Sequence, residues 1–312
     1  MSIKFTLPTN LSHLKLGEAI AFQGISDNGV TKVELLADDK FKLGETGVYD
    51  GTWTISYPFN RVGKRRIVAN GFDANQQQIS SDAVDVFLVG ARQNELGIDI
   101  YSNNGDSIDW QTVKNSDISF AFAKATEGET FVDSQFAKYW KSMKAAGLIR
   151  GAYHFFRPLK DPKLQADNFL KQIQDLEIGD LPPVLDIEHY PEKIALEWQQ
   201  VSLNQRIDIV QQWLDKVESA TGRKPIIYTS PSFWDEYIED SQAFINYPLW
   251  LAHYTDKPEP TVPANNWGGK GWTIWQYTER GTVAGVNGFV NRNRFNSSFD
   301  DLVAFVKDSL IA

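Results

Sequence analysis

Two carboxylates two positions apart stand in the apolar segment PPVLDIEHY, which covers residues 182–190. Side chains of a β-strand alternate between its two faces, so Asp186 and Glu188 are predicted to share one face. Burial and a second negative charge nearby both raise the pKa of a carboxyl group. General acid catalysis near neutral pH needs such an acid. The segment therefore predicts an acid–base site, with a solvated strand end as the alternative.

The residues that would position these acids alternate between strand and helix patterns from residue 96 onward. Eight segments have strand character: LGIDIYS, DISFAFAKA, RGAYHFF, PPVLDIE, KPIIYTS, PLWLAHY, WTIWQYT and GFVNRNRF. Amphipathic segments between several of them predict helices: DSQFAKYWKSMKAAG, KLQADNFLKQIQDL and LNQRIDIVQQWLDKVESATG. This order predicts an α/β fold, a compact and irregular (β/α) barrel. The alternative is a doubly wound sheet, although no glycine-rich phosphate-binding segment follows any of the strands.

The strand ends are the informative positions, because catalytic side chains of such a barrel lie at the carboxyl ends of its strands. In this sequence those ends are acidic, polar or aromatic. Acids surrounded by aromatic rings suit a neutral polyhydroxylated substrate and acid catalysis of its glycosidic bond. The alternative is that the rings fill the barrel and the acids are solvated at its rim. The residues are Asp99, Tyr101, Tyr153, His154, Asp186, Glu188, Tyr228, Trp250, Tyr254, Gln276 and Asn291.

Seven segments also match a known family in order and spacing: GIDIYS, IDWQTVKNSDISFAFAKATEG, GAYHFF, PPVLDIE, IIYTSPSFW, LWLAHY and WTIWQYT. Over about residues 95–300 the chain resembles the glycoside hydrolase family 25 lysozymes, the Chalaropsis-type muramidases. The resemblance implies a flattened, irregular (β/α) TIM-like barrel that cleaves the β-1,4 bond between N-acetylmuramic acid and N-acetylglucosamine in peptidoglycan. Glu188 matches the general acid of that family, and Asp186 and Asp99 match its supporting acids. We expect the substrate to be bound by Tyr101, Tyr153, Tyr228, Trp250, Tyr254, Gln276 and Asn291.

One position departs from the family pattern. The family commonly has an aspartate in a V-D-x-N-x-F segment at its last strand, whereas this chain reads FVNRNRF with Asn291 at that place. Asparagine keeps a hydrogen-bonding side chain but lacks the charge. The substitution bears on activity more than on fold or substrate.

Composition excludes several other functions. The chain has no cysteine, which rules out disulfides, thiolate zinc sites and a cysteine nucleophile, and its four histidines show no H-E-x-x-H spacing. We therefore expect no metal and no cofactor. Residues 91–312 hold 22 basic and 30 acidic side chains, so nucleic acid is a poor partner. No segment has the roughly 18 apolar residues of a membrane span.

Residues 1–90 have a different pattern, with the short strand-like segments AIAFQGIS, KVELLAD, GTWTISYPF, RRIVANGFD and AVDVFLV separated by turn signals. They predict a small all-β sandwich that resembles the immunoglobulin-like modules of bacterial wall proteins. The polar segment ARQNEL, residues 91–96, is a predicted joint, so the expected domains are residues 1–90 and 95–312. The first domain is expected to bind a cell wall or a delivery partner, or to act as a spacer.

The sequence thus predicts a muramidase that acts on bacterial peptidoglycan. Two alternatives stay open: a glycan-binding protein on a decayed hydrolase barrel, and a hydrolase of another N-acetylglucosamine polymer such as chitin. The first residues, MSIKFTLPTN, lack the apolar region of a signal peptide. We therefore expect the chain to reach the wall by phage-type lysis or by non-classical secretion.

Overall fold

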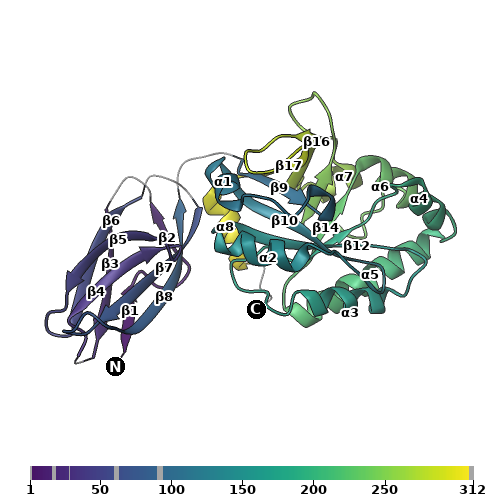
Figure 1. Cartoon of the computed structure of the whole chain (residues 1–312). Coiled ribbons are helices and arrows are strands. Elements are labelled where there is room, and N and C mark those ends of the chain that lie inside the picture. The colour runs from purple at the N-terminus through teal and green to yellow at the C-terminus, as the bar shows by residue number, and fades with distance from the viewer. Residues whose placement is uncertain (1, 16–18, 28, 60–62, 90–93, 309–312) are drawn as a thin grey trace. The chain divides into compact units, whose positions relative to one another are not determined.

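The computed structural model of the chain describes residues 2–15, 19–27, 29–59, 63–89 and 94–308 (Figure 1). Its internal contacts divide the chain into two compact units: Met1–Arg92 with Ala145–Leu148, and Gln93–Lys144 with Ile149–Ala312. Residues 91–93 of the predicted joint lie outside the described residues. None of the helices that the structure describes is long and apolar enough to cross a membrane.

The residues that the structure describes between 2 and 89 form β-strands joined by turns and loops, with no helix among them. One sheet has the order β1-β3-β6, and a second has the order β2-β8-β7-β4-β5. All neighbouring strands are antiparallel except β2 and β8. The strands are β1 (Ile3–Leu7), β2 (Ser12–Lys15), β3 (Ala19–Ser26), β4 (Lys32–Ala37), β5 (Phe41–Gly47), β6 (Thr52–Pro58), β7 (Gly63–Phe72) and β8 (Gln78–Val89).

Alternating side chains give the first unit its core. In β4 every second residue is buried, so Val33, Leu35 and Ala37 point inward while the residues between them are partly exposed. Phe22 and Trp53 of the three-stranded sheet belong to the same buried cluster. The five predicted strand segments correspond to β3, β4, β6, β7 and β8; the sequence interpretation missed β1, β2 and β5.

The second unit is a closed barrel of eight strands. The order is β9-β10-β12-β13-β14-β15-β16-β17, and β17 pairs with β9 to close it. Closure excludes the doubly wound sheet. All eight predicted strands are present: β9 (Leu96–Ile100), β10 (Ile118–Glu127), β12 (Ile149–Phe155), β13 (Val184–Asp186), β14 (Ile226–Thr229), β15 (Leu249–Ala252), β16 (Ile274–Gly281) and β17 (Val290–Phe295). A short strand, β11 (Phe131–Val132), extends the sheet beside β10.

The last strand runs against the other seven. The other seven barrel strands pair in parallel, whereas β17 is antiparallel to both β16 and β9. Asn291 therefore lies at the beginning of its strand, and the prediction that it closes a strand is wrong. Because the direction is reversed, this beginning meets the carboxyl end of β9, where Asn291 pairs with Asp99. The connection of residues 282–289 has no helix, in keeping with a hairpin rather than a crossover.

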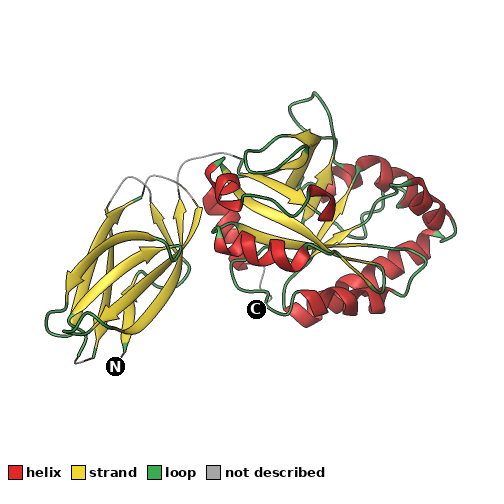
Figure 2. Ribbon diagram, viewed as in Figure 1, coloured by secondary structure: helices red, strands yellow, loops and turns green. Residues whose placement is uncertain are grey.

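Helices lie outside the barrel strands (Figure 2). The longest, α5 (Leu203–Thr221), buries Val210, Trp213, Leu214 and Val217, the i, i+3, i+4 and i+7 positions of one face, and ends at Gly222 with φ 64°. The three predicted helices correspond to α2 (Phe136–Ala145), α3 (Pro162–Gln172) and α5. The sequence interpretation did not predict the remaining helices, which are short: α1 (Trp110–Asn115), α4 (Glu192–Gln199), α6 (Pro231–Tyr237), α7 (Pro263–Gly268), α8 (Phe299–Asp308) and the 3-10 helix η1 (Ser102–Asn104).

Candidate active site

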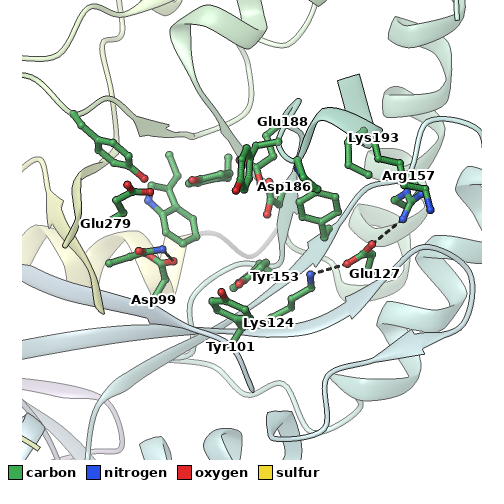
Figure 3. Close-up of a pocket in the computed structure, with 18 residues that line it drawn as sticks. Asp99, Tyr101, Lys124, Glu127, Tyr153, Arg157, Asp186, Glu188, Lys193 and Glu279 are labelled. Carbon is green, nitrogen blue, oxygen red and sulfur yellow. Dashed lines mark hydrogen bonds and ion pairs between the residues drawn. The ribbon is translucent and has the colours of Figure 1, made fainter. Parts of the chain in front are cut away.

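A pocket of about 420 Å³ opens where the seven parallel strands end and β17 begins (Figure 3). Nine of the ten predicted site residues line it: Asp99, Tyr101, Tyr153, Asp186, Glu188, Tyr228, Trp250, Tyr254 and Asn291. They come from six strands and from the segments that follow these strands. The barrel therefore brings together side chains that are up to 192 positions apart in the sequence.

Asp99 is held by three side-chain amides. Gln276 Nε2 and Asn293 Nδ2 each donate a hydrogen bond of 2.8 Å to its Oδ1, and Asn291 Nδ2 donates one of 2.8 Å to Oδ2. Burial raises the pKa of Asp99, and the three amide donors oppose that rise by favouring the ionised form. The carboxylate is thus fixed in position by neutral groups, and none of the ion pairs found among the described residues involves it.

Gln276 lies behind the pocket, not on its surface. It is 1% exposed, and its Oε1 accepts hydrogen bonds from the hydroxyls of Tyr228 at 3.0 Å and Tyr254 at 2.6 Å. Gln276 is therefore set back from the pocket surface, and its predicted contact with substrate stays a prediction. Gln276 of β16 thus connects Tyr228 of β14 and Tyr254, which follows β15, to Asp99 of β9.

Asp186 and Glu188 both line the pocket, but only Asp186 belongs to a strand. Strand β13 ends at Asp186, and Glu188 lies in the segment that follows. Burial raises the pKa of both groups, that of Glu188 to about 7, and the negative charge of Glu188 raises the pKa of Asp186 further. The positive charge of Lys124 lowers the pKa of both carboxyl groups and so opposes these effects. The pair therefore keeps a proton at a pH where an exposed carboxyl group has lost it.

One oxygen of Asp186 has no hydrogen-bond partner. Its Oδ1 is buried, and no donor among the described residues reaches it. A buried carboxylate oxygen without a donor is costly, because it has lost water and gained nothing in return. Because Asp186 lines the pocket, its carboxyl group can gain an N–H or O–H donor from a ligand that the protein itself does not supply.

Aromatic rings form the floor and the rim of the pocket. Trp250 is 1% exposed, stacks on Phe122 with a centroid distance of 4.3 Å, and donates from Nε1 to Asn293 Oδ1 at 2.8 Å. Tyr153 and Tyr228 contact Trp250 edge to face. Tyr101 and Tyr254 at the rim are 39% and 49% exposed. Flat apolar faces with hydroxyl groups at their edges suit a sugar ring.

His154 is not part of the pocket. It is fully buried and stacks on Trp213 of α5, with Thr126 and Gln165 as its hydrogen-bond partners. Burial lowers the pKa of His154 to about 3, so it stays neutral at physiological pH. Its side chain points outward because it follows Tyr153 on the same strand, and successive side chains face opposite sides.

A row of ion pairs on one wall of the pocket was missed by the sequence interpretation. Lys124 Nζ lies 2.8 Å from Glu127 Oε2, and Glu127 Oε1 accepts a hydrogen bond from Arg157 Nη1 at 2.9 Å (Figure 3). Arg157 also pairs with Glu197. Lys124 and Glu127 lie near the carboxyl end of β10, so the same search of strand ends that selected the other site residues could have found them. Arg157, like Lys193 and Glu279, gave no periodic signal.

Asn293 was also missed. It is fully buried and connects Asp99 to Trp250, since its Nδ2 donates to Asp99 and its Oδ1 accepts from Trp250. The alternation of side chains along β17 could have predicted Asn293, because Asn291 and Asn293 are two positions apart and must face the same side of the strand.

Comparison with known proteins agrees with this geometry. Residues 98–286 match the model of the glycosyl hydrolases family 25. The chain is 42% identical over 215 residues to the uncharacterized protein YegX of Escherichia coli K12, covering 67% of this chain and 72% of that protein. It is 36% identical over 217 residues to lysozyme M1 of Streptomyces globisporus, covering 68% and 71%. The bacterial lysozyme from Streptomyces coelicolor superimposes with a TM-score of 0.63 at 36% identity, covering 69% of this chain and 97% of that structure.

Proposed function

The chain belongs to glycosyl hydrolase family 25, with lysozymes and muramidases as its relatives, and from this premise we propose how it acts on peptidoglycan. The enzyme hydrolyses the β-1,4 bond between N-acetylmuramic acid and N-acetylglucosamine. The observation that carries this proposal is a pair of pocket carboxyl groups, Asp186 and Glu188, that retains a proton near neutral pH beside a fixed third carboxylate, Asp99.

Glu188 is the general acid. Its pKa of about 7 keeps a substantial protonated fraction at neutral pH, and the carboxyl group lies in the open pocket where a glycosidic oxygen can reach it. As the bond to the anomeric carbon breaks, the proton passes to the leaving oxygen and the departing sugar leaves as an alcohol.

Asp186 orients the 2-acetamido group of the sugar on the other side of the bond. Its carboxyl group, which lines the pocket, accepts the acetamido N–H, and this bond turns the carbonyl oxygen of the acetamido group toward the anomeric carbon. That oxygen attacks the anomeric carbon as the leaving group departs and forms an oxazolinium ion. Water then opens the ring, and Glu188, now ionised, takes the proton of that water.

Asp99 stabilises the positive charge that develops on the sugar. Its carboxylate is already oriented by three amide donors, so no reorganisation is needed as the charge develops. Asn291 keeps this carboxylate in place, while Tyr153, Tyr228, Trp250 and the rim tyrosines bind the sugar rings.

The remaining proposals concern the architecture. We assign residues 95–312 to a catalytic domain, a flattened variant of the (β/α) barrel of the Chalaropsis type. Residues 1–90 form an immunoglobulin-like module, for which the two sheets around one core are the support. It tethers the enzyme to a wall or a delivery partner, or acts as a spacer. The intact set of Asp99, Asp186 and Glu188 argues against a decayed, purely glycan-binding barrel.

Product analysis tests the proposal. The full chain is incubated with purified peptidoglycan, the products are reduced with borohydride, and the new reducing ends are identified. A muramidase yields muramitol ends. Glucosaminitol ends, or cleavage of chitin oligomers at a comparable rate, would instead point to hydrolysis of an N-acetylglucosamine bond, and binding without new ends would favour the decayed barrel.

A further inference from the structure

The charged residues of the pocket are not evenly distributed. Figure 3 shows Arg157 and Lys193 on the side of Glu188 that faces away from Asp99 and Glu279. The three pocket cations are Lys124, Arg157 and Lys193. A substrate that carries negative charge on one substituent is therefore bound in one orientation, with that substituent away from Asp99.

Of the three cations, two are already neutralised. Lys124 and Arg157 pair with Glu127 and Glu197, two cations with two anions. These pairs are shielded, with side-chain exposures between 12% and 26%, and they leave no net charge on the wall.

Lys193 is the cation that adds net positive charge. It lies in the first turn of α4 and is exposed, and none of the ion pairs or hydrogen bonds found among the described residues involves it. The segment that carries it also contributes Tyr190, which is 74% exposed, and Ile194 to the lining. A cation beside an aromatic ring and an aliphatic side chain suits a short acidic peptide better than a bare sugar.

Resting on the proposed muramidase function, we propose that Lys193 binds a carboxylate of the peptide stem that the N-acetylmuramic acid residue carries on its lactyl group. The stem lies along the wall of Tyr190, Lys193, Ile194 and Arg157. The enzyme thus prefers glycan strands that carry peptide stems over glycan strands without them. In an enzyme with a formal net charge of −9, this contact offsets the repulsion that the acidic pocket exerts on an anionic substrate.

The test compares two substrates that differ only in the stem. Glycan strands with intact stems are set beside strands whose stems an amidase has removed, which keep the lactyl carboxylate. For the full chain, the ratio of kcat/KM on the two substrates is measured in the wild type, Lys193→Gln, Lys193→Arg and Lys171→Gln. Lys171 is an exposed lysine of α3 that does not line the pocket.

Lys193→Gln is expected to lower the ratio about 2- to 5-fold, the size of one exposed charge pair. Lys193→Arg keeps the ratio near the wild-type value, and Lys171→Gln leaves it unchanged. Raising the ionic strength lowers kcat/KM on stem-bearing strands more steeply in the wild type than in Lys193→Gln.

Calorimetric titration of soluble fragments with and without stems separates this inference from the proposed function. The role of Lys193 is overturned if Lys193→Gln lowers kcat/KM equally on both substrates, or if it does not weaken the binding of stem-bearing fragments. Either result can occur in an active muramidase. If the wild type cleaves neither substrate, the proposed function fails, while the titration still decides whether Lys193 binds the stem.

Discussion

Asn291 Nδ2 donates a hydrogen bond of 2.8 Å to Oδ2 of Asp99, across the antiparallel pair of β17 and β9. An amide at position 291 gives Asp99 a donor, where an aspartate would place a second carboxylate in contact with the first. Two carboxylates in contact repel each other, and each raises the pKa of its neighbour. Asn291 thus holds the Asp99 carboxylate in place without adding negative charge near Glu188.

Asn291→Asp should move the alkaline limb of the pH profile of kcat/KM upward, by several tenths of a unit to about one unit. The charge of Asp99 already raises the pKa of Glu188, and a second ionised carboxylate beside it acts in the same direction. Profiles on peptidoglycan fragments from about pH 3 to 9 check this. Asn287→Asp, an exposed change outside the pocket, is the control. Superimposable profiles would show that position 291 is electrostatically silent.

Glu188→Gln should lower kcat by about 10²- to 10⁴-fold, because the leaving oxygen then receives no proton. Glutamine has nearly the same shape and needs no charge to be desolvated, so the midpoint of thermal unfolding at pH 7 should not fall. Rates of reducing-end release and unfolding curves are compared with those of Glu236→Gln, an exposed change on α6 that does not line the pocket. Wall lysis at the wild-type rate by Glu188→Gln would refute the assignment of the general acid.

Lys124→Met should also raise the pKa of Glu188, since the positive charge of Lys124 lowers it. The ammonium lies 4.7 Å from the centroid of the Phe155 ring, and methionine preserves an apolar contact there. The alkaline limb of kcat/KM should therefore shift upward by up to about one unit, whereas Lys171→Met should not move it. A downward shift, or none, would mean that Lys124 serves the ion pair with Glu127 and has no effect on catalysis.

The strands of the barrel could be predicted from the sequence because buried strands are short apolar runs between turn signals, as in β12 and β14. The direction of β17 could not, since a strand has the same side-chain pattern in both directions. In the first unit, β5 escaped because its residues alternate weakly: FKLGETG has exposed or partly exposed side chains throughout.

Site residues were predictable where they lie at the carboxyl end of a strand, as Asp99 and Asp186 do, because the barrel gathers these strand ends at one side. Gln276 obeyed the same rule, yet it lies behind the pocket, since side-chain depth depends on the packing of the neighbouring strands. Arg157 lies in the loop between β12 and α3, whose path depends on tertiary contacts, here hydrogen bonds of the Gln165 side-chain amide with the backbone N–H and carbonyl of Arg157. Lys193 lies in the first turn of α4, a short helix that the sequence interpretation did not predict.

Removal of the first 91 residues should leave a folded chain that cleaves soluble muropeptide oligomers, because the family match begins at residue 98 and the barrel closes on its own strands. Circular dichroism, thermal unfolding and oligomer hydrolysis are compared with those of the full chain. Lower activity on intact walls, with full activity on oligomers, would assign wall tethering to the first unit. An insoluble or unfolded product would show instead that the first unit stabilises the second.

Hydrolysis should proceed with retention of configuration, because attack by the acetamido oxygen and then by water inverts the anomeric carbon twice. Proton NMR of the first-formed product should therefore show the β anomer, before mutarotation supplies the α form. Asp186→Asn should lower kcat by about 10²-fold or more with retention preserved, since the amide cannot stabilise the charge that develops on the acetamido group. Replacing the acetamido group of a test substrate by a trifluoroacetamido group makes the attacking oxygen a weaker nucleophile. This replacement should lower the kcat of the wild-type enzyme. An α anomer formed first would mean direct attack by water, with Asp186 as a general base, and would exclude the participation of the acetamido group.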